Sequence, residues 1–330
     1  MTIKSIAVVG AGAFGTSLAI ATARAGTAVF LWARRQDLAR ELDRERVNGT
    51  YLPGIEIPED IRIASDPECL SEAEAILFAV PSQHLRALAN QVKGSIRPDA
   101  VLVSCAKGIE QESLKFPSDV LGEVLPGHPL AVLSGPTFAK EVAMGLPSAI
   151  TLAVDDRAAG TRLVEAIGSK CFRPYLSHDL IGAQVGGAVK NVLAIACGIV
   201  QGRTLGDNAR AALITRGLAE ITRLGQALGG KPETLMGLSG LGDLTLTCSA
   251  MQSRNFSLGV ALGEGRTLED VLAERKSVTE GVYSAAGVVR LAARHELDMP
   301  ISFAADAILN KNASVEATID KLLARPFKSE

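Results

Sequence analysis

The sequence predicts an α/β protein in which a doubly wound sheet, with helices on both faces, precedes an all-helical domain. Short apolar runs alternate with helical patterns from Ile3 to Leu176, which is typical of strands joined by crossover helices. After Val200 the periodicity is helical and no further strand is expected. We therefore expect two domains, residues 1–178 and 179–330, with the boundary near His178 where the last strand ends.

Length and composition support two domains and exclude several classes of protein. At 330 residues the chain is long for one hydrophobic core, and 47% hydrophobic with only 4% aromatic residues indicates a core of Ala, Val, Leu and Ile. A net charge of −2 gives no support for nucleic-acid binding, which leaves a basic footprint. The five cysteines are odd in number and form no C-x-x-C pair: Cys69, Cys105, Cys171, Cys197 and Cys248. Reduced thiols in the cytoplasm, with no disulfide framework and no metal site, are therefore expected.

Two apolar stretches could be mistaken for membrane segments. Residues 6–23 carry no charge, but their glycines and hydroxyl side chains fit a turn better than a lipid-facing run. Residues 180–200 contain Lys190 and Asn191 near their middle, which makes insertion into a bilayer costly. We expect a soluble protein with no membrane span.

A glycine-rich segment follows the first predicted strand, Ile3–Val9. It reads GAGAFG from Gly10 to Gly15 and leads into an Ala-rich helix that continues to Arg24. Strand, G-x-G-x-x-G and helix in that order form the fingerprint of a dinucleotide-binding turn. Gly10 allows the tight turn, Gly12 lets backbone N–H groups approach a pyrophosphate, and Gly15 brings the helix close to the sheet. The first domain is therefore predicted to be a Rossmann-type dinucleotide-binding domain.

Two arginines, Arg34 and Arg35, follow the second predicted strand, Ala28–Trp32. An NAD-selective site normally has an acidic residue here, which binds the ribose 2′-hydroxyl. Guanidinium groups suit a 2′-phosphate instead, so we expect NADPH to be preferred over NADH. The alternative is a pair of solvated surface arginines, continuous with the mixed charges of residues 40–46.

The other predicted strands of the first domain lead into polar or glycine-containing turns. They are expected at Ala75–Val80, Val101–Cys105, Leu130–Leu133, Ala149–Val154 and Phe172–Leu176. In a doubly wound sheet, ligands bind outside the carboxyl ends of the strands. Lys107, Gly135 and Thr137 follow such strand ends and are therefore candidate site residues. For each of them alone, an ordinary turn residue is an equally good interpretation.

The stretch from Leu180 to Val200 contains one charged residue, Lys190. At helical spacing, one face of this stretch is lined by Val185, Val189, Val192, Leu193 and Ala196, and we expect a helix buried nearly all round. Burial disfavours the charged form of an ammonium and can lower its pKa towards neutrality. A lysine tuned in this way can donate a proton to a carbonyl oxygen. The alternative is a lysine whose stem packs inside while its ammonium reaches water.

The second half of the chain is predicted to be helical. Helical periodicity is found at Arg210–Leu228, Leu268–Lys276, Ser284–Glu296, Ile301–Leu309 and Val315–Ala324. A glycine-rich loop is expected at Gly237–Cys248, with its backbone packed close to a site and Asp243 held by local N–H groups. Alternatively, this loop is a simple connection between helices in which Asp243 acts as a cap.

The segment Gln252–Asn255 opens an apolar run that continues from Phe256 to Leu262. Ser253, Arg254 and Asn255 at a helix N-terminus form an anion site, because unpaired N–H groups and a guanidinium converge there. The alternative is simple N-capping of the helix. An anion site beside a dinucleotide-binding domain indicates a phosphorylated substrate.

Together these segments resemble one known family over essentially the whole chain. The matching motifs are GAGAFGTSLA (10–19), Lys107-Gly108, SGPTFAKE (134–141), GGAVKNV (186–192), ARAALITRGLAE (209–220), GLGDLTLTC (240–248) and QSRN (252–255). The sequence resembles the bacterial, soluble type of NAD(P)-dependent glycerol-3-phosphate dehydrogenase. The resemblance implies reversible reduction of dihydroxyacetone phosphate to sn-glycerol 3-phosphate, which supplies phospholipid synthesis in the cytoplasm.

The resemblance also implies roles for individual residues. Lys190 becomes the catalytic acid/base, with Lys107, Asp243 and Thr247 around the reacting centre. Substrate contacts are implied for Gly135, Thr137, Ser253, Arg254 and Asn255, in addition to the reacting-centre residues. Cofactor contacts are implied for Gly10, Gly12, Ala13, Phe14, Gly15, Arg34, Arg35, Lys107, Ala139, Arg254, Val278 and Glu280. NADH remains usable, no nucleic acid or metal is involved, and a homodimer is one assembly the chain could form.

Two other functions remain open at this point. A related two-domain dehydrogenase acting on a β-hydroxyacid also uses a lysine on the first helix after the sheet, but it requires a carboxylate site in place of the QSRN cluster. An NADPH-binding regulator without chemistry would retain the cofactor turn, with Lys190 in a structural role. Turnover that depends on the substrate phosphate would exclude the β-hydroxyacid dehydrogenase, and turnover of any ketone would exclude the regulator without chemistry.

Overall fold

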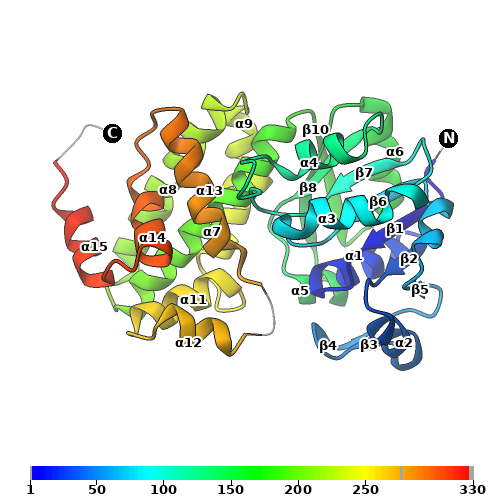
Figure 1. The fold of residues 1–330 in the computed structure, drawn as a ribbon, viewed down its shortest axis with the longest axis horizontal. Coiled ribbons are helices and arrows are strands. Elements are labelled where there is room, and N and C mark those ends of the chain that lie inside the picture. Colours follow the sequence, from blue (N-terminus) through cyan, green and yellow to red (C-terminus); the bar gives the residue numbers. More distant parts are fainter. Residues whose placement is uncertain (1, 276–277, 327–330) are drawn as a thin grey trace. The chain divides into compact units, whose positions relative to one another are not determined.

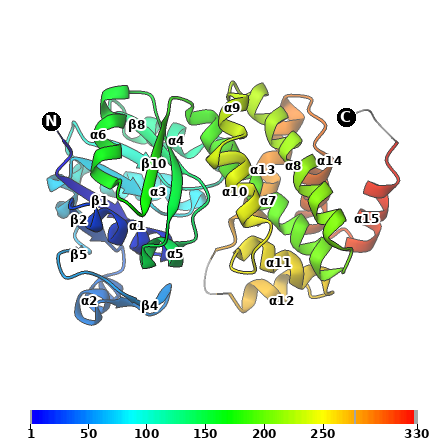
Figure 2. The same cartoon turned by 180° about the vertical axis from the view of Figure 1, so that it is seen from behind.

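The computed structural model describes residues 2–275 and 278–326 (Figures 1 and 2). The chain divides into two compact units. The first unit, here called the sheet unit, contains Met1–Lys107 and Lys115–Gln184. The second, here called the helical unit, contains Gly108–Leu114 and Val185–Glu330. Each unit has its own set of elements.

The sheet unit contains an eight-stranded sheet with the strand order β10-β9-β8-β7-β6-β1-β2-β5. Its strands are β1 (Ser5–Val9), β2 (Ala28–Trp32), β5 (Arg62–Ala64), β6 (Ala75–Phe78), β7 (Val101–Ser104), β8 (Leu130–Ser134), β9 (Ser148–Val154) and β10 (Phe172–Ser177). Its α-helices are α1 (Ala13–Arg24), α2 (Gln36–Glu45), α3 (Ser82–Val92), α4 (Pro117–Val124), α5 (Ala139–Met144) and α6 (Arg157–Ile167). The five strands predicted after β2 are all present, and the observed ends differ from the predicted ends by at most two residues.

Helices cover both faces of this sheet. Ile6 and Val8 of β1 lie in a core that also contains buried residues of α1, α5 and α6. Ala7 and Val9, the alternate residues of the same strand, lie in a second core with residues of α3 and α4. Because successive side chains of a strand point to opposite faces, this alternation places one helical layer on each side. The doubly wound, Rossmann-type fold class is confirmed.

Parts of this unit differ from a purely parallel sheet. Strand β9 pairs antiparallel with β8, and β10 then pairs parallel with β9, so the last two strands run opposite to the others. A small antiparallel pair, β3 (Val47–Asn48) and β4 (Leu52–Glu56), and the edge strand β5 were not predicted. Strand β3 has only two residues, and β4 and β5 contain exposed polar residues, Pro or Gly, so all three lack the apolar run that identifies a buried strand.

The helical unit is built around α7 (Leu180–Gly202), which belongs to this unit from Val185 onwards. Figures 1 and 2 show α7 among α8, α11 and α13. The other helices are α8 (Asp207–Ala227), α9 (Pro232–Leu235), α10 (Asp243–Thr247), α11 (Arg254–Gly263), α12 (Leu268–Ala273), α13 (Glu280–Arg294), α14 (Pro300–Asn310) and α15 (Val315–Leu323). Every residue of α7 from 182 to 200 is buried apart from the half-buried Ala196, as its pattern predicted. It is the one helix of the described chain long and apolar enough to cross a membrane, and 94% of its apolar window is buried within the protein.

Two expectations for the helical half need correction. The glycine-rich segment 237–248 is not a loop, because Leu238–Gly242 forms a π-helical turn that continues directly into α10. Helix α12 ends at Ala273 rather than continuing to Lys276, which lies outside the described residues.

The segment Gly108–Leu114 also belongs to this unit, where Gln111 Nε2 donates to the carbonyl oxygen of Tyr283 at 3.3 Å.

Candidate active site

The turn between β1 and α1 brings the chain close to the neighbouring strand. Gly10 has φ +113°, and a Cβ there would lie 2.7 Å from the carbonyl oxygen of Ala79 and from Cγ1 of Val80, so only glycine fits. The Cβ position of Gly15 meets the Gly10 backbone, which brings α1 close to the end of β1. At Gly12 nothing lies within 4 Å of the Cβ position, which leaves the backbone there open to a ligand. The tight turn at Gly10 and the close approach at Gly15 are as the glycine spacing predicted, and the contact of Gly12 with a pyrophosphate stays a prediction.

Sequence reasoning missed Asn48, which supports this turn from β3. Its side chain is fully buried, and Nδ2 donates to the carbonyl oxygen of Ala11 at 3.0 Å and to Oγ1 of Thr16 at 2.8 Å. Its Oδ1 accepts from the N–H of Tyr51 at 3.1 Å. Asn48 therefore connects the glycine turn, the first turn of α1 and the β3–β4 hairpin. A buried amide in a two-residue strand gives no sequence signal of its own.

Arg34 and Arg35 follow the carboxyl end of β2, and both are exposed. Arg35 precedes α2 and forms an ion pair with Asp37, whose side chain is also exposed, at 3.7 Å. Exposed ion pairs contribute little to stability, so this contact leaves the guanidinium available to a ligand. The geometry is compatible with a 2′-phosphate site and with solvated surface arginines.

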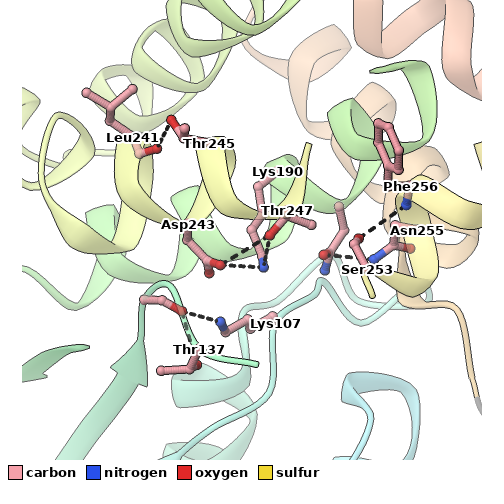
Figure 3. Close-up of polar contacts among 12 residues, drawn as sticks. Lys107, Thr137, Lys190, Leu241, Asp243, Thr245, Thr247, Ser253, Asn255 and Phe256 are labelled. Atoms are coloured by element: carbon pink, nitrogen blue, oxygen red, sulfur yellow. Dashed lines mark hydrogen bonds and ion pairs between the residues drawn. The ribbon is translucent and has the colours of Figure 1, made fainter. Parts of the chain in front are cut away.

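Lys107, Gly135 and Thr137 come together at the ends of β7 and β8 (Figure 3). The Nζ of Lys107 donates to the carbonyl oxygen of Gly135 at 2.8 Å, and Thr137 Oγ1 donates to the same oxygen at 3.2 Å. The ammonium also lies 5.9 Å from the ring centroid of Phe14, which belongs to the glycine turn. The three residues that follow these strand ends therefore lie close together in the sheet unit.

Lys190 is 6% exposed and forms the centre of a polar cluster in the helical unit. Its Nζ donates to Oδ1 of Asp243 at 2.6 Å and to Oγ1 of Thr247 at 2.8 Å, as Figure 3 shows. Thr247 Oγ1 in turn donates to Asp243 Oδ1 at 3.3 Å. The ammonium is thus bonded inside the protein rather than extended into water.

Glycine packing brings the partners of Lys190 to α7. A Cβ at Gly186 would lie 3.0 Å from Cα of Gly240 in the π-helical turn, so the two backbones are in direct contact. The chain continues from this turn into α10, where Asp243 and Thr247 are four residues apart. Residues at this spacing share one helix face, so both side chains point at the ammonium. π-helical turns occur often at functional sites.

The Ser253–Asn255 segment starts α11, and each side chain has a partner inside the helical unit. Ser253 Oγ accepts from the N–H of Phe256 at 3.2 Å, so the helix is N-capped. Arg254 Nη1 donates to the carbonyl oxygen of Val278 at 2.8 Å. Asn255 Nδ2 donates to Oδ1 of Asn191 at 2.9 Å, and Asn255 Oδ1 accepts from the N–H of Gly281 at 3.0 Å.

The remaining predicted contacts lie at helix starts. Ala139 is the first residue of α5 in the sheet unit, and Glu280 is the first residue of α13 in the helical unit. Their residue types and spacing did not indicate a site, so these two contacts were predicted from the family resemblance alone. Within residues 2–275 and 278–326, no group of three or more His, Cys, Asp or Glu side chains could hold a metal ion.

Comparison with known proteins identifies the family. The family model for the N-terminus of NAD-dependent glycerol-3-phosphate dehydrogenase matches residues 5–160, and the model for its C-terminus matches residues 179–320. The chain belongs to this family. It is 53% identical to the glycerol-3-phosphate dehydrogenase [NAD(P)+] of Parvibaculum lavamentivorans, over 99% of this chain and 98% of that protein. It is 52% identical to the Caulobacter vibrioides enzyme of the same name, over the full length of both.

Solved structures agree with this assignment. The crystal structure of glycerol-3-phosphate dehydrogenase from Coxiella burnetii superposes with a TM-score of 0.94 at 40% identity, covering 98% of this chain and 99% of that one. A ketopantoate reductase from Ralstonia eutropha shares the fold alone, with a TM-score of 0.62 at 17% identity over 97% and 99% of the two chains. The family resemblance that the motifs indicated is confirmed.

Proposed function

We propose that this protein reduces dihydroxyacetone phosphate reversibly to sn-glycerol 3-phosphate with a nicotinamide dinucleotide. The observation that carries this proposal is sequence identity of 52–53%, over essentially the full length of the chain, to enzymes named glycerol-3-phosphate dehydrogenase [NAD(P)+]. The buried Lys190–Asp243–Thr247 cluster supplies the groups that a carbonyl reduction requires. The β-hydroxyacid alternative has no comparable support, because the family models that match both parts of the chain are those of glycerol-3-phosphate dehydrogenase.

We further propose that residues 1–178 bind the dinucleotide and residues 179–330 bind the substrate. The glycine turn fits a dinucleotide, because its backbone is open at Gly12 and the N-terminus of α1 follows directly. The residues that would hold it are Gly10, Gly12, Ala13, Phe14, Gly15, Arg34, Arg35, Lys107, Ala139, Arg254, Val278 and Glu280. When bound, the reduced nicotinamide supplies a hydride to the substrate carbonyl carbon. The two exposed arginines favour NADPH over NADH.

In the proposed mechanism, Lys190 protonates the carbonyl oxygen as negative charge develops on it. Asp243 and Thr247 hold the ammonium by two hydrogen bonds, which fixes its direction. Lys107 adds positive potential, and Gly135 and Thr137 line the substrate side with it. No step requires a metal.

The phosphate of the substrate is assigned to the N-terminus of α11. Ser253, Arg254 and Asn255 lie there, beside N–H groups that have no partner within the helix. Binding energy gained at the phosphate positions the small reacting end of the molecule, so it raises turnover as well as affinity.

One assay tests the proposed function directly. NADPH oxidation is measured with dihydroxyacetone phosphate and, as the control, with unphosphorylated dihydroxyacetone. Turnover that depends on the phosphate supports the proposal. Equal turnover of both ketones would remove the phosphate site, and no turnover of any ketone despite tight NADPH binding would favour a regulator.

We also propose that the protein is soluble, acts in the cytoplasm and supplies glycerophospholipid synthesis, with a homodimer as the assembly to test. The cysteines of the described chain are all free, as in a reducing compartment. Light scattering of the purified protein together with fractionation of cells tests assembly and location.

A further inference from the structure

Four glycines form a close crossing of two helices in the helical unit. Gly198 and Gly202 of α7 face Gly259 and Gly263 of α11, and each pair has G-x-x-x-G spacing. A Cβ at Gly198 would lie 2.8 Å from Cα of Gly259, and one at Gly202 would lie 3.0 Å from Cα of Gly263. Real Cβ atoms essentially never approach closer than 3.0 Å, so a larger residue requires the helices to move. These four residues are called the glycine crossing below.

The crossing is reciprocal. Each glycine lies over a backbone carbonyl of the facing helix: Gly198 over Phe256, Gly202 over Val260, Gly259 over Ile195 and Gly263 over Ile199. Small residues at this spacing let helix backbones approach closely, and Cα–H groups then face carbonyl oxygens. Backbone atoms have no alternative rotamers, so such a contact fixes the separation of the helices more narrowly than side-chain packing does.

The two crossed helices carry the two ends of the proposed substrate site. Helix α7 carries Lys190, and α11 starts at Ser253–Asn255. The hydrogen bond from Asn255 Nδ2 to Oδ1 of Asn191, at 2.9 Å, joins the start of α11 to the residue beside Lys190 (Figure 3). A change in the separation of α7 and α11 therefore changes the distance between the ammonium and the anion-binding residues.

We propose that the glycine crossing sets this distance and so matches the site to the separation between the carbonyl and the phosphate of a three-carbon ketone phosphate. The inference rests on the proposed function, because it assigns the carbonyl to Lys190 and the phosphate to the start of α11. The four glycines are positioning residues and contact no substrate. Dihydroxyacetone phosphate spans both ends of the site, whereas inorganic phosphate occupies only the α11 end.

Alanine variants of the crossing test the proposal. Gly198→Ala and Gly259→Ala place a methyl group against the facing backbone and should separate the helices. Since a displacement of about 1 Å can reduce turnover about 10²-fold, kcat/KM for dihydroxyacetone phosphate should fall by roughly that factor. The KM for NADPH and the inhibition constant of inorganic phosphate should each change less than about twofold, an energy below 0.5 kcal/mol or so. Gly263→Ala, whose Cβ would lie 2.6 Å from the Ile199 carbonyl oxygen, is a third variant at the far end of the crossing and should lower kcat/KM less, by about tenfold.

Gly160→Ala is the matched control. Gly160 is a buried glycine of α6 in the sheet unit, and the nearest atoms to its Cβ would be side-chain atoms of Val154 and Leu176, so the variant perturbs packing without touching α7 or α11. Its melting temperature should fall while kcat/KM stays that of the wild type. Wild-type kinetics in the folded crossing variants would overturn the proposal. A phosphate inhibition constant that rises in parallel with the KM for dihydroxyacetone phosphate would also overturn it, because the crossing would then support only the anion site itself.

A measurement on the wild type needs no variant. The homologue of dihydroxyacetone phosphate with one more methylene group between carbonyl and phosphate should be reduced about 10²-fold less efficiently. Equal efficiency for both ketone phosphates would contradict a fixed spacing. If the wild type does not oxidise NADPH with dihydroxyacetone phosphate at all, the proposed function fails, and this result is distinct from failure of the spacing inference.

Discussion

The sheet unit and the helical unit build their candidate site residues in different ways. In the sheet unit these residues follow strand ends, and most of the contacts use backbone atoms: the open backbone at Gly12 and the Gly135 carbonyl that accepts from Lys107. In the helical unit the contacts are made by side chains that lie far apart in the sequence. Lys190 bonds to Asp243 and Thr247, 53 and 57 residues later.

This difference separates binding from chemistry. Backbone N–H groups at a helix N-terminus suit a large anionic cofactor and cost no side-chain ordering. A buried ammonium held by a carboxylate and a hydroxyl is fixed in direction and removed from water, which suits proton transfer. Variants of the glycine turn should therefore change cofactor affinity, and variants of the Lys190 cluster should change turnover.

Lys190→Ala gives the largest expected effect. Loss of a general acid typically reduces turnover by about 10²–10⁴-fold, and the NADPH dissociation constant should stay that of the wild type because the glycine turn is untouched. The measurement is steady-state kinetics together with a fluorescence titration of NADPH. Near-normal turnover would remove Lys190 from the mechanism, and loss of NADPH binding would break the separation between the units.

The same variant removes the ammonium that donates to the buried carboxylate of Asp243, and breaking a buried ion pair by removing one partner costs about 3–5 kcal/mol in the free energy of unfolding. The double variant Lys190→Ala/Asp243→Ala should recover much of this stability without recovering turnover. Denaturant unfolding of both proteins separates the structural contribution of the pair from its chemical one.

Asn48→Ala should affect the sheet unit alone. Removing the amide deprives the Ala11 carbonyl and the Thr16 hydroxyl of their donor, and an unsatisfied buried polar group costs about 1–3 kcal/mol. A loss of roughly 1.4 kcal/mol in the binding free energy of NADPH would raise its dissociation constant about tenfold, and this is the size of effect we expect. The inhibition constant of inorganic phosphate is the control and should not move. A rise in both constants would show that the Asn48 contact serves more than the cofactor turn.

Arg34→Asp should reverse the choice of cofactor. A bond between a guanidinium and a 2′-phosphate contributes on the order of 1.5–3 kcal/mol, so the wild type should prefer NADPH about tenfold or more. Since both arginines are exposed, the preference should shrink as ionic strength rises. The aspartate repels the phosphate and accepts from the ribose hydroxyl of NADH. If the wild type uses both cofactors equally at low salt, these arginines are solvated surface charges.

Glu220→Gln should give the smallest effect, because this buried carboxylate lies outside the candidate site. Burial raises the pKa of Glu220 above its usual 4.5, although Ser302 and the N–H of Ile301 donate to it. With a folded pKa above the unfolded one, its contribution to stability is fully present below pH 4.5 and is lost as pH rises through the folded value. The melting temperature of the wild type should therefore fall relative to that of Glu220→Gln across this range, with kcat/KM unchanged. A constant difference at every pH would exclude this titration.

The sequence predicted those parts of the molecule whose signal is local. The strands ending before Gly10, Lys107 and Gly135 are apolar runs next to turn residues, so both the fold class and the strand-end side chains followed from the pattern. The helix around Lys190 was equally clear. The antiparallel direction of β9 was not, because an apolar run identifies a strand but not the orientation of its partner.

Long-range pairing carries no such signal. Nothing in the residue types required Lys190 to meet Asp243, and the glycines before Asp243 were read as a loop although they form a π-helical turn against α7. Asn48 and the glycine crossing were missed for the same reason, since each acts through a contact with a distant segment. Only the family resemblance, which rests on many motifs together, grouped Lys190 with Asp243 and Thr247, which the structure shows in contact.

The most direct test of the account is chemical rescue of Lys190→Ala. The variant is saturated with NADPH and dihydroxyacetone phosphate, and small primary ammonium ions of different acidity are added. If Lys190 donates the proton, turnover should rise in proportion to the ammonium concentration and should be faster with the more acidic ions. Turnover that no ammonium ion restores, in a variant that still binds both ligands, would contradict the assignment of proton transfer to Lys190.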